Sequence, residues 1–552
     1  MTASFNLITD PWIAVRAPGG EVHELSIRDV FHRADEFQGL AGEIPTQEVA
    51  VFKLLLAIMY RTTARKRTQD DTLTDWSEWW ESGKLPLTEL DAYLDRYADR
   101  FDLFHPEFPF MQVSSLHTAK GGASGLEKLI AEVPAGHKFF TTRDRAGIEI
   151  LSYAEAARWL VHAHAFDPSG IKSGAVGDER VRGGKGYPIG IGVSGWFGTV
   201  IAEGATLRET LLLNLVLSTD PSSDTTPWER EPHTAADDWM HSAPRGTADL
   251  YTWQTRRIRL FEGGGVVHDV LLANGDRLGP QNLHNLEPLS AWRFSEPQTK
   301  KLGHPTYMPR SHDNSRAMWR GLEPMLTKAA LGGKSLRPGL IDRIADLRLN
   351  GFLPTDQMIR LRAVGIEYGS QSAVISATVD DSLPVSVAVL GDEFLALAAI
   401  RAADVAQECV IILANLASDL AHAAGTDPDI GRAYAFELGF STLDPLFRRW
   451  FAGLRADSHP DDIAATWQLV LRRSLTYAGA QLCRDAGEGA LTGRLKSIKS
   501  GSAELERVFD TAQSWHKFAR ALRKATPAAD PDSGSSGGEG NSTDESTREE
   551  NT

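Results

Sequence analysis

The pattern of the chain changes at Gly391, and this change restricts the possible folds more than any other feature of the sequence. The stretch that follows, "DEFLALAAIRAADVAQECVIILANLASDLAHAA", is long, rich in Ala and Leu, and free of Pro and Gly. Three more segments with helical spacing of apolar residues follow it after short loops, at about 431–455, 461–486 and 491–525. Successive amphipathic helices of this length predict an antiparallel four-helix bundle over residues 391–525.

The part of the chain before the bundle mixes helical and strand patterns. Residues Thr46–Arg61 place apolar side chains at helical spacing, whereas "YTWQTRRIRLFEG" and "GVVHDVLLANG" have the pattern of strands. No regular alternation of strands and helices is present, so a doubly wound sheet is not expected. We therefore expect an α+β protein, with a large mixed domain at 1–385, the bundle at 391–525, and a disordered acidic tail rich in Ser, Gly, Glu and Asp at 526–552.

Composition points to a cytoplasmic protein. The two cysteines, Cys409 and Cys483, cannot build a disulfide framework or a cysteine zinc site. The N-terminus lacks the basic region and apolar run of a signal peptide, and no apolar run reaches the ~18 residues that a membrane span needs. The net charge of −15 argues against a protein that coats nucleic acid indiscriminately, but a local basic patch can still attract phosphates.

The stretch "DPSGIKSGAVGDERVRGGKGYPIGIGVSG", Asp167–Gly195, combines many glycines with several basic residues. Glycine lets a backbone approach a ligand closely, and the basic residues favour an anionic one. The stretch does not match the phosphate-binding pattern G-x-x-x-x-G-K-[ST], because Asp167 stands where the first Gly should be. By pattern alone, it is either a basic loop that contacts phosphates or a groove, or a surface loop with incidental charges.

No pattern in the chain argues for catalysis. His162 and His164, and His304 and His312, lack a known metal-ligand spacing, and no G-x-S-x-G motif or distinctive carboxylate pair is present. We therefore expect a protein that is not an enzyme and that uses no metal or cofactor. Two alternatives stay open at this point: an enzyme that binds phosphate through the Gly-rich loop and acts on nucleic acid, and a helical scaffold that binds only proteins.

Basic residues also gather outside the Gly-rich stretch. Taken singly, each such group is most often a solvated face, but together with the loop they favour contact with nucleic acid. They are Arg310, Arg316 and Arg320 in the mixed domain, and Arg448, Arg449, Arg472, Arg473, Arg494 and Lys496 in the bundle, with Arg494 and Lys496 at the start of its last expected helix.

Several segments, in their order along the chain, resemble the CasA family, the large subunit of the type I-E CRISPR surveillance complex Cascade. The opening "FNLITDPWIAVR" is similar to the start of the family, and "HPEFPFMQV" to a segment that follows it. "FDPSGIKSG" resembles the family's glycine loop, and "EYGSQSAVI" the segment that bears its glutamine wedge. The resemblance extends to about Ala525 and includes a C-terminal four-helix bundle.

The resemblance implies a non-catalytic role in antiviral defence. In the family, this subunit recognises the protospacer-adjacent motif on double-stranded DNA and starts strand separation, so that the guide CRISPR RNA can pair with the target in an R-loop. A glycine loop and a basic finger approach the motif from the minor groove, and the glutamine wedge enters the base stack. The implied partners are the other Cascade subunits, the guide RNA, duplex target DNA, the displaced single strand and a helicase–nuclease that the complex recruits.

The resemblance also assigns these roles to positions of this chain. The glycine loop lies at Ser169 and Gly170, next to Lys172, Ser173 and Gly174, and the many later glycines leave open which one touches DNA. The wedge is Gln371, preceded by Ser370, and the basic finger is Arg293. The loop "HKFFTTRD" corresponds to a segment near the motif and the 5′ end of the guide RNA, with Phe140 and Thr142 as its contacting residues. The basic residues of the bundle are expected to hold the displaced strand.

Overall fold

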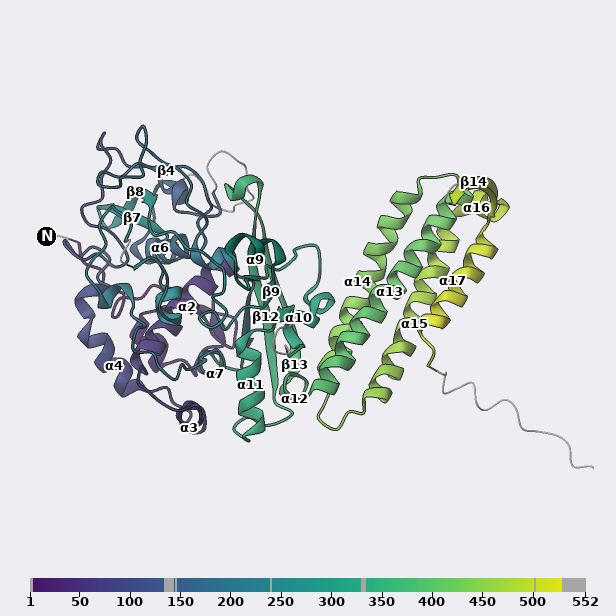
Figure 1. Cartoon of the computed structure of the whole chain (residues 1–552), viewed down its shortest axis with the longest axis horizontal. Helices are drawn as coiled ribbons and strands as arrows, with labels where there is room; N and C mark the ends of the chain where they lie inside the picture. Colours follow the sequence, from purple (N-terminus) through teal and green to yellow (C-terminus); the bar gives the residue numbers. More distant parts are fainter. Residues whose placement is uncertain are drawn as a thin grey trace, which may run out of the picture. The chain divides into compact units, whose positions relative to one another are not determined.

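The computed structural model describes residues 3–133, 143, 146–238, 241–328, 334–500 and 503–528. The chain forms two compact units, Met1–Leu397 with Phe451–Ala456, and Ala398–Trp450 with Asp457–Thr552 (Figure 1). Among the described residues, no helix combines the length and the apolar character needed to cross a membrane.

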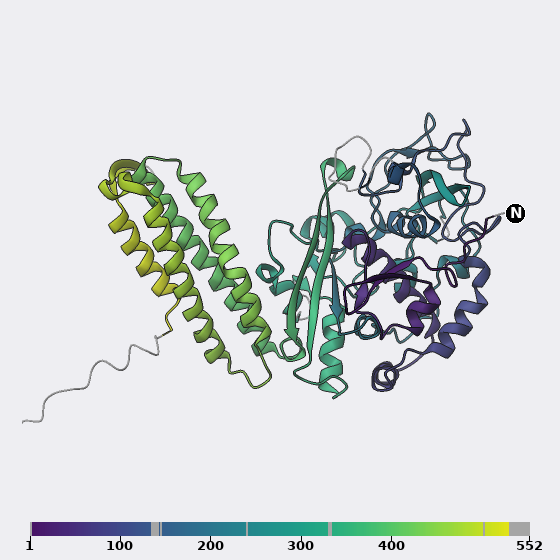
Figure 2. The ribbon, with the colours of Figure 1, turned by 180° about the vertical axis from the view of Figure 1, so that it is seen from behind.

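Long helices dominate the second unit and lie side by side in both views (Figures 1 and 2). Aromatic side chains pack in the core between these helices. The Trp467 indole is buried against Phe447 and Trp450 and donates a hydrogen bond to the Ala402 carbonyl (2.9 Å). This arrangement confirms the expected packing of long C-terminal helices. The elements are α13 (Glu393–Ala424), α14 (Pro428–Ala452), α15 (Pro460–Asp485), α16 (Gly487–Thr492), β14 (Arg494–Ser500), β15 (Ala503–Phe509) and α17 (Thr511–Ala525).

The expectation of one helix over 491–525 is wrong, because a β-hairpin occupies its first half. α16 is followed by Gly493, whose φ of 75° favours glycine, and a Cβ there would lie 2.7 Å from the Phe509 carbonyl oxygen. β14 then pairs antiparallel with β15, from Arg494 opposite Phe509 onward. The last helix begins only at Asp510, whose side chain caps α17 by accepting from the Gln513 amide (2.7 Å).

The first unit is a mixture of short helices and small sheets, which confirms the expected α+β class. The strands expected from "RRIRLFEG" and "VVHDVLLAN" form as β7 and β8. Its helices are α1 (Ile27–His32), α2 (Pro45–Thr62), α3 (Gln69–Glu81), α4 (Leu87–Arg96), α5 (Ala146–Glu149), α6 (Tyr153–Phe166), α7 (Leu207–Leu213), α8 (Thr247–Tyr251), α9 (Glu296–Leu302), α10 (Glu323–Leu326), α11 (Gly339–Leu349) and α12 (Val387–Gly391).

Its strands form four small sheets, in the orders β2-β1-β3, β5-β4-β8-β7, β13-β12-β6 and β10-β9-β11. The buried helix α2 packs against α6, α8 and the β12–β13 hairpin, so the core lies between this hairpin and the helices. The strands are β1 (Ile13–Arg16), β2 (Val22–Leu25), β3 (Gly39–Leu40), β4 (Lys172–Ser173), β5 (Lys185–Gly186), β6 (Thr199–Glu203), β7 (Arg256–Gly263), β8 (Val266–Asn274), β9 (Trp292–Phe294), β10 (Tyr307–Pro309), β11 (Ser335–Leu336), β12 (Met358–Tyr368) and β13 (Ile375–Ser386).

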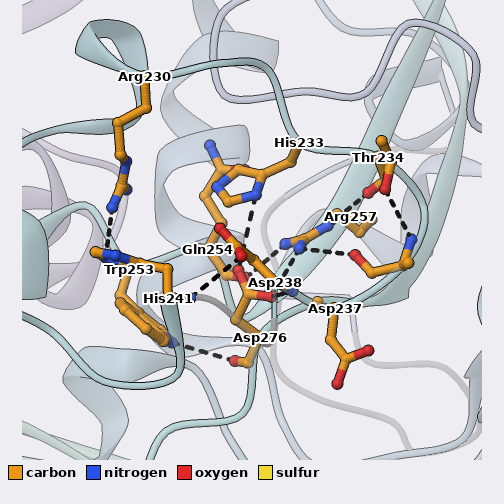
Figure 3. A network of polar contacts seen from close by, with 12 residues as sticks. Arg230, His233, Thr234, Asp237, Asp238, His241, Trp253, Gln254, Arg257 and Asp276 are labelled. Atoms are coloured by element: carbon orange, nitrogen blue, oxygen red, sulfur yellow. Dashed lines mark hydrogen bonds and ion pairs between the residues drawn. The ribbon is translucent and has the colours of Figure 1, made fainter.

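A polar network around Arg257 anchors the segment that runs from Arg230 to Asp238 (Figure 3). The buried Arg257 guanidinium pairs with Asp276 (2.7 Å) and donates to the Thr234 carbonyl (2.8 Å). The same Asp276 oxygen accepts from the Asp238 amide (2.8 Å). Burial, and then the nearby Arg257 cation, lower the pKa of His233 to about 3. The network therefore holds a neutral histidine and a satisfied ion pair, an arrangement that serves structure.

Two further histidines are buried on α6. The His162 ring nitrogen Nε2 lies 3.0 Å from the Thr46 hydroxyl, and the His164 Nε2 donates to the Met111 carbonyl (2.9 Å). Burial lowers the pKa of His162 to about 3 and that of His164 to about 4. Both rings are therefore neutral at pH 7, and their role is to satisfy polar groups in the core.

These buried histidines predict a loss of stability in mild acid. In the unfolded chain a histidine binds a proton near pH 6.5, whereas His162, His164 and His233 stay neutral in the folded protein until pH 3–4. The unfolded state binds more protons between these values, so the free energy of unfolding falls as pH decreases from about 6.5, by up to ~1.4 kcal/mol per pH unit for each histidine.

Urea unfolding followed by tryptophan fluorescence between pH 7 and 5 measures this slope. The variant His164→Gln, which can still donate to Met111, should lower the slope by about one histidine's share, while His268→Gln, on a side chain that is 45% exposed, should leave it unchanged. Equal slopes for wild type and His164→Gln would contradict the prediction.

Candidate nucleic-acid interface

Helix α6 leads the chain into the glycine-rich stretch and ends on a buried carboxylate. Its start is fixed by a capping box, in which Ser152 and Glu155 each accept from the other's backbone amide. Asp167 caps its C-terminal end and forms ion pairs with Arg256 (2.5 Å) and Lys172 (2.6 Å). Burial by itself would raise the pKa of Asp167, but the Lys172 and Arg256 cations hold it below its usual value. The first residue of the stretch is thus a charged anchor.

Arg256 ties the two ends of this stretch together. Its guanidinium is fully buried at the start of β7 and donates to the backbone carbonyls of Asp167 (3.3 Å), Pro168 (3.1 Å) and Gly190 (2.8 Å). With further bonds to the Asp167 carboxylate and the Thr255 carbonyl, the cation donates five hydrogen bonds, which fix its position and direction because the donors of a guanidinium are rigidly arranged. The entry and the exit of the glycine-rich stretch therefore meet at one side chain.

Lys172, Ser173 and Gly174 lie along the inner side of the stretch. The Lys172 ammonium is 9% exposed and burial lowers its pKa, although Asp167 acts in the opposite direction. Ser173 pairs with Lys185 and with Ala273 of β8, so it belongs to a sheet. A Cβ on Gly174 would lie 2.5 Å from the Gly184 carbonyl carbon, so this glycine is required by internal packing.

Two of the solvent-accessible parts of the stretch bear on ligand contact. One is the segment Pro168–Ile171, and the other is the turn at Gly183 and Gly184, whose φ values of 59° and 74° favour glycine. The exposed Arg182 and Lys185 flank this turn and exchange backbone hydrogen bonds (3.1 Å each). The stretch therefore offers a small loop on one side and a basic two-glycine turn on the other.

Gln371 is exposed at the tip of the β12–β13 hairpin. The tip is closed by hydrogen bonds between the backbones of Gly369 and Val374 (2.9 Å) and of Ser372 and Gly369 (2.9 Å). Gln371 has φ 54° and ψ 20°, and Ser372 also has φ 54°, so two non-glycine residues in succession adopt the left-handed region. Such strain is rare and persists only where the surrounding structure imposes it. Ser370, beside Gln371, is also exposed.

The glycine loop and the hairpin tip are in direct contact. The Ser169 amide donates to the Ser372 carbonyl (2.7 Å), and the hydroxyl of the half-buried Tyr368 donates to the Phe166 carbonyl (2.8 Å) from 202 positions away. Gly170 faces Ala373, and both line a pocket of about 420 Å³ that also includes Lys172 and Ser173. The two segments that the sequence resemblance singled out therefore form one continuous surface.

Arg293 lies on another part of the first unit. It is exposed in the middle of β9, opposite Met308 of β10 and Ser335 of β11. Phe140 and Thr142 lie outside the described residues. Arg143, which follows them, pairs with Glu132 (3.1 Å) and Glu155 (3.5 Å), so that end of the loop is tied to the start of α6.

The basic residues predicted in the bundle differ in their surroundings. Arg448 pairs with Asp444 one turn earlier (2.8 Å), and Arg472 donates to the Thr526 hydroxyl (3.2 Å) just after α17. Lys496 donates to His422 (2.9 Å), and the Arg494 guanidinium lies against Gly425. Arg449 and Arg473 are exposed and form no hydrogen bond or ion pair with a described residue.

Sequence reasoning missed Arg256 and Tyr368, which position the site without facing solvent. A signal for the first exists in "RRIRL": neighbouring residues of a strand point to opposite faces, so Arg256 and Arg257 can each reach a different buried carboxylate. Basic residues in an otherwise apolar strand thus indicate buried ion pairs. Tyr368 carries no comparable signal, because its partner is a backbone carbonyl.

Comparisons with known proteins identify relatives over nearly the whole chain. The model of the family described as CRISPR-associated protein Cse1 matches residues 6–478. The CRISPR-associated protein CasA/Cse1 of Thermus thermophilus is 29% identical over 535 residues, which cover 91% of this chain and 97% of that protein.

Solved structures agree with this match. The crystal structure of Thermobifida fusca Cse1 is 43% identical and covers 96% of this chain and 99% of its own, with a TM-score of 0.86. Cse1 from Acidimicrobium ferrooxidans is 28% identical over 96% of this chain and 99% of its own, with a TM-score of 0.80. A chain from a structure described as a CRISPR RNA-guided surveillance complex shares the fold at 21% identity, with a TM-score of 0.68, over 94% of this chain and 99% of its own.

The match of the family model over most of the sequence, and the shared fold of both units, lead to the same conclusion as the segment order along the chain. The chain belongs to the CRISPR-associated Cse1 (CasA) family.

Proposed function

We propose that this chain is the subunit of an RNA-guided antiviral surveillance complex that recognises the protospacer-adjacent motif in duplex DNA and starts its unwinding. The observation that carries the proposal is the contact between Ser169 and Ser372, which unites the glycine loop with the wedge hairpin in one surface. Membership of the Cse1 family supports it, as does the likeness to a chain of a CRISPR RNA-guided surveillance complex.

In this proposal Gln371 is the wedge. Its side chain is exposed at the tip of a long hairpin, and its left-handed backbone is held by the Gly369 hydrogen bonds rather than by packing of the side chain. Unstacking one base step costs a few kcal/mol, which an inserted side chain partly offsets. Exchange of duplex DNA for an RNA–DNA hybrid is nearly balanced after that step, so stabilising the first opened step decides whether unwinding proceeds.

The loop at Ser169 and Gly170 approaches the minor groove in the same proposal. The minor groove distinguishes mainly A·T from G·C pairs, so backbone approach there gives tolerant recognition of a short motif. Gly174 is committed to internal packing and the Lys172 ammonium to Asp167, so we assign these two residues a supporting role in holding the loop. The exposed Arg293 is the cationic finger of the proposal.

The bundle has the second role, retention of the displaced strand and recruitment of the helicase–nuclease. Of its candidate residues, Arg449 and Arg473 have no described partner, so their charge remains available to a phosphate. Single strands bind basic surfaces mainly by electrostatics, with strong salt dependence.

Among the described residues no group of three or more His, Cys, Asp or Glu side chains is placed to hold a metal ion. No specific contact in the described part of the chain favours the alternative of a phosphate-processing enzyme. Nuclease or nucleotide-hydrolysing activity in the purified chain would support that alternative.

The wedge assignment is tested by Gln371→Ala in the reconstituted complex. We expect assembly to be unchanged and DNA opening to be about 10-fold slower, the effect of losing roughly 1.4 kcal/mol of stabilisation at the first step. A fluorescent base analogue next to the motif reports opening. Gln371→Gly, which relieves the backbone strain but also removes the side chain, should be slow as well, and Gln38→Ala, at an exposed glutamine elsewhere, should be normal. Normal opening in Gln371→Ala would exclude the wedge role.

Two glycine variants test which part of the stretch meets DNA. A Cβ on Gly170 would contact only the Ala373 carbonyl, at an ordinary 3.9 Å, so Gly170→Ala should fold normally but reduce enrichment of the preferred motif from a library of duplexes randomised at the motif. Gly174→Ala should instead lower the melting temperature, because its Cβ would lie 2.5 Å from Gly184. Unchanged motif enrichment in Gly170→Ala would redirect the assignment to the turn at Gly183 and Gly184.

The double variant Arg449→Gln/Arg473→Gln tests the bundle. We expect weaker retention of the displaced strand and a salt dependence of log K that is shallower by ~0.7 for each lost single-strand phosphate contact. Crosslinking of a photoreactive displaced strand over a salt series measures it. Arg401→Gln, an exposed arginine of α13 outside the candidate set, is the control. Retention equal to that of the wild type would remove these two residues from the strand path.

A further inference from the structure

A second pocket, of about 290 Å³, opens beside the middle of the β12–β13 hairpin, away from its tip. Its walls come mainly from the segment that follows β10, starting at Arg310, and from the hairpin residues Ala363, Val379 and Asp381. β12 and α10, which both contribute lining residues, are labelled in Figure 1. Arg310 and Arg316, basic residues for which the proposed function has no use, both line it.

Arg310 has an unsatisfied guanidinium. The side chain is half-buried, and its only hydrogen bond to a described residue goes from one terminal nitrogen to the Ser335 hydroxyl (3.2 Å). Its Nε is buried without a hydrogen-bond partner, and no carboxylate of a described residue lies within ion-pair distance. A buried donor left unpaired is destabilising, and more so on a charged group, so the site favours an anionic acceptor.

The carboxylates at the pocket already accept hydrogen bonds from nearby backbone amides and a hydroxyl. Asp381 accepts from the amides of Met318 (2.6 Å) and Ser382 (2.7 Å). Asp313 accepts from the amide and the hydroxyl of Ser315 (2.9 and 2.6 Å), and Arg316 is 3.4 Å away with its side chain 55% exposed. An exposed pair at this distance contributes little, so Arg316 can turn to a ligand at the rim.

The His312 ring forms part of the pocket wall and adds no positive charge. Its Nε2 donates to the Thr199 carbonyl (3.1 Å), and burial lowers its pKa, so the ring is neutral at pH 7. Gly198 and Gly365 make room for it, because a Cβ at either position would come within 3.3 Å of the ring. The positive charge of the pocket therefore comes from its arginines.

The strand register relates this pocket to Arg293. Residues directly opposite on antiparallel strands share a face, so Arg293, Met308 and Ser335 lie on one face of the β10-β9-β11 sheet. The Arg310 amide donates to the Ala291 carbonyl (2.9 Å), which continues the ladder by two residues and places Arg310 on that same face. Ser335, opposite Arg293, is the residue that Arg310 contacts. One sheet face thus carries an exposed arginine and an unsatisfied one.

We propose that this pocket binds a backbone phosphate of duplex DNA, with Arg310 as the buried cation and Arg316 at the rim. The proposal rests on the proposed function for the identity of the nucleic acid, but the contact itself is independent of the motif. An open pocket that shares its face with an exposed arginine suits a polymer lying across that face better than an isolated small anion. The guanidinium of Arg310 can meet two phosphate oxygens with its free Nε and a terminal nitrogen.

The test measures duplex binding by the full-length chain over a salt series. Fluorescence anisotropy of labelled duplexes, with and without the preferred motif, gives the affinity and its salt slope. Arg310→Gln and Arg316→Gln should each weaken binding about 3- to 10-fold on both duplexes and make the slope shallower by ~0.9, the value for one lost phosphate contact. Arg310→Lys should recover part of the affinity. Arg33→Gln, at an arginine that is 45% exposed and paired with Glu36, should match the wild type.

Wild-type affinity and slope in Arg310→Gln would overturn the proposal, as would the absence of duplex binding by the wild-type chain at low salt. If Arg310→Gln fails to fold, the exposed Arg316→Gln decides, and an unchanged slope there overturns the proposal. Inorganic phosphate or a mononucleotide could instead raise the melting temperature of the wild type but not of Arg310→Gln, while Arg310→Gln binds duplexes like the wild type. That result would assign the pocket to a small anion. If instead the wedge or the motif assignment is wrong, only DNA opening and the binding of the motif-bearing duplex depart from expectation. Failure of the pocket proposal and failure of the proposed function are therefore distinguishable.

Discussion

One buried guanidinium, that of Arg256, holds the glycine-rich stretch at both ends, and the arrangement of the proposed interface depends on it. Its partner Asp167 ends α6 and also binds Lys172, so a compact cluster of charges sits beneath an otherwise open loop. Charges in such a place are tolerated only when each is paired and hydrogen-bonded, and removal of one partner of a buried pair costs about 3–5 kcal/mol. The flexibility expected of a run of glycines is therefore confined to its exposed parts.

The same anchor explains how the loop meets the hairpin tip. Tyr368 fixes the end of β12 to the last turn of α6, and Ser169 then reaches Ser372. The strained backbone at Gln371 and Ser372 is supported from this side, which keeps an exposed side chain at a defined position. A preorganised loop and tip lose little conformational entropy when they bind a partner, which suits the proposed contact with duplex DNA.

β7 shows how one strand can organise two separate regions. Arg256 and Arg257 are neighbours, so the alternation of a strand sends one guanidinium to the glycine-rich stretch and the other to Asp276 and the segment around Thr234 (Figure 3). In the β10-β9-β11 sheet, this alternation and the strand register together put Arg293 and Arg310 on a common face. In these short sheets, buried and half-buried arginines thus add specific polar contacts to the hydrophobic packing.

Periodicity and short motifs predicted the α+β class, the long helices of the bundle, the strands β7 and β8, and the family, because they are local properties of the chain. They misassigned 491–525, since Gly493 and the pairing of β14 with β15 override a helical pattern in that segment. Only the tertiary structure decided that Ser169 touches Ser372, that Lys172 and Gly174 face inward, and that Arg310 lacks a carboxylate among the described residues. These are relations between distant segments, and burial and pairing of charges are set by the neighbours that folding supplies.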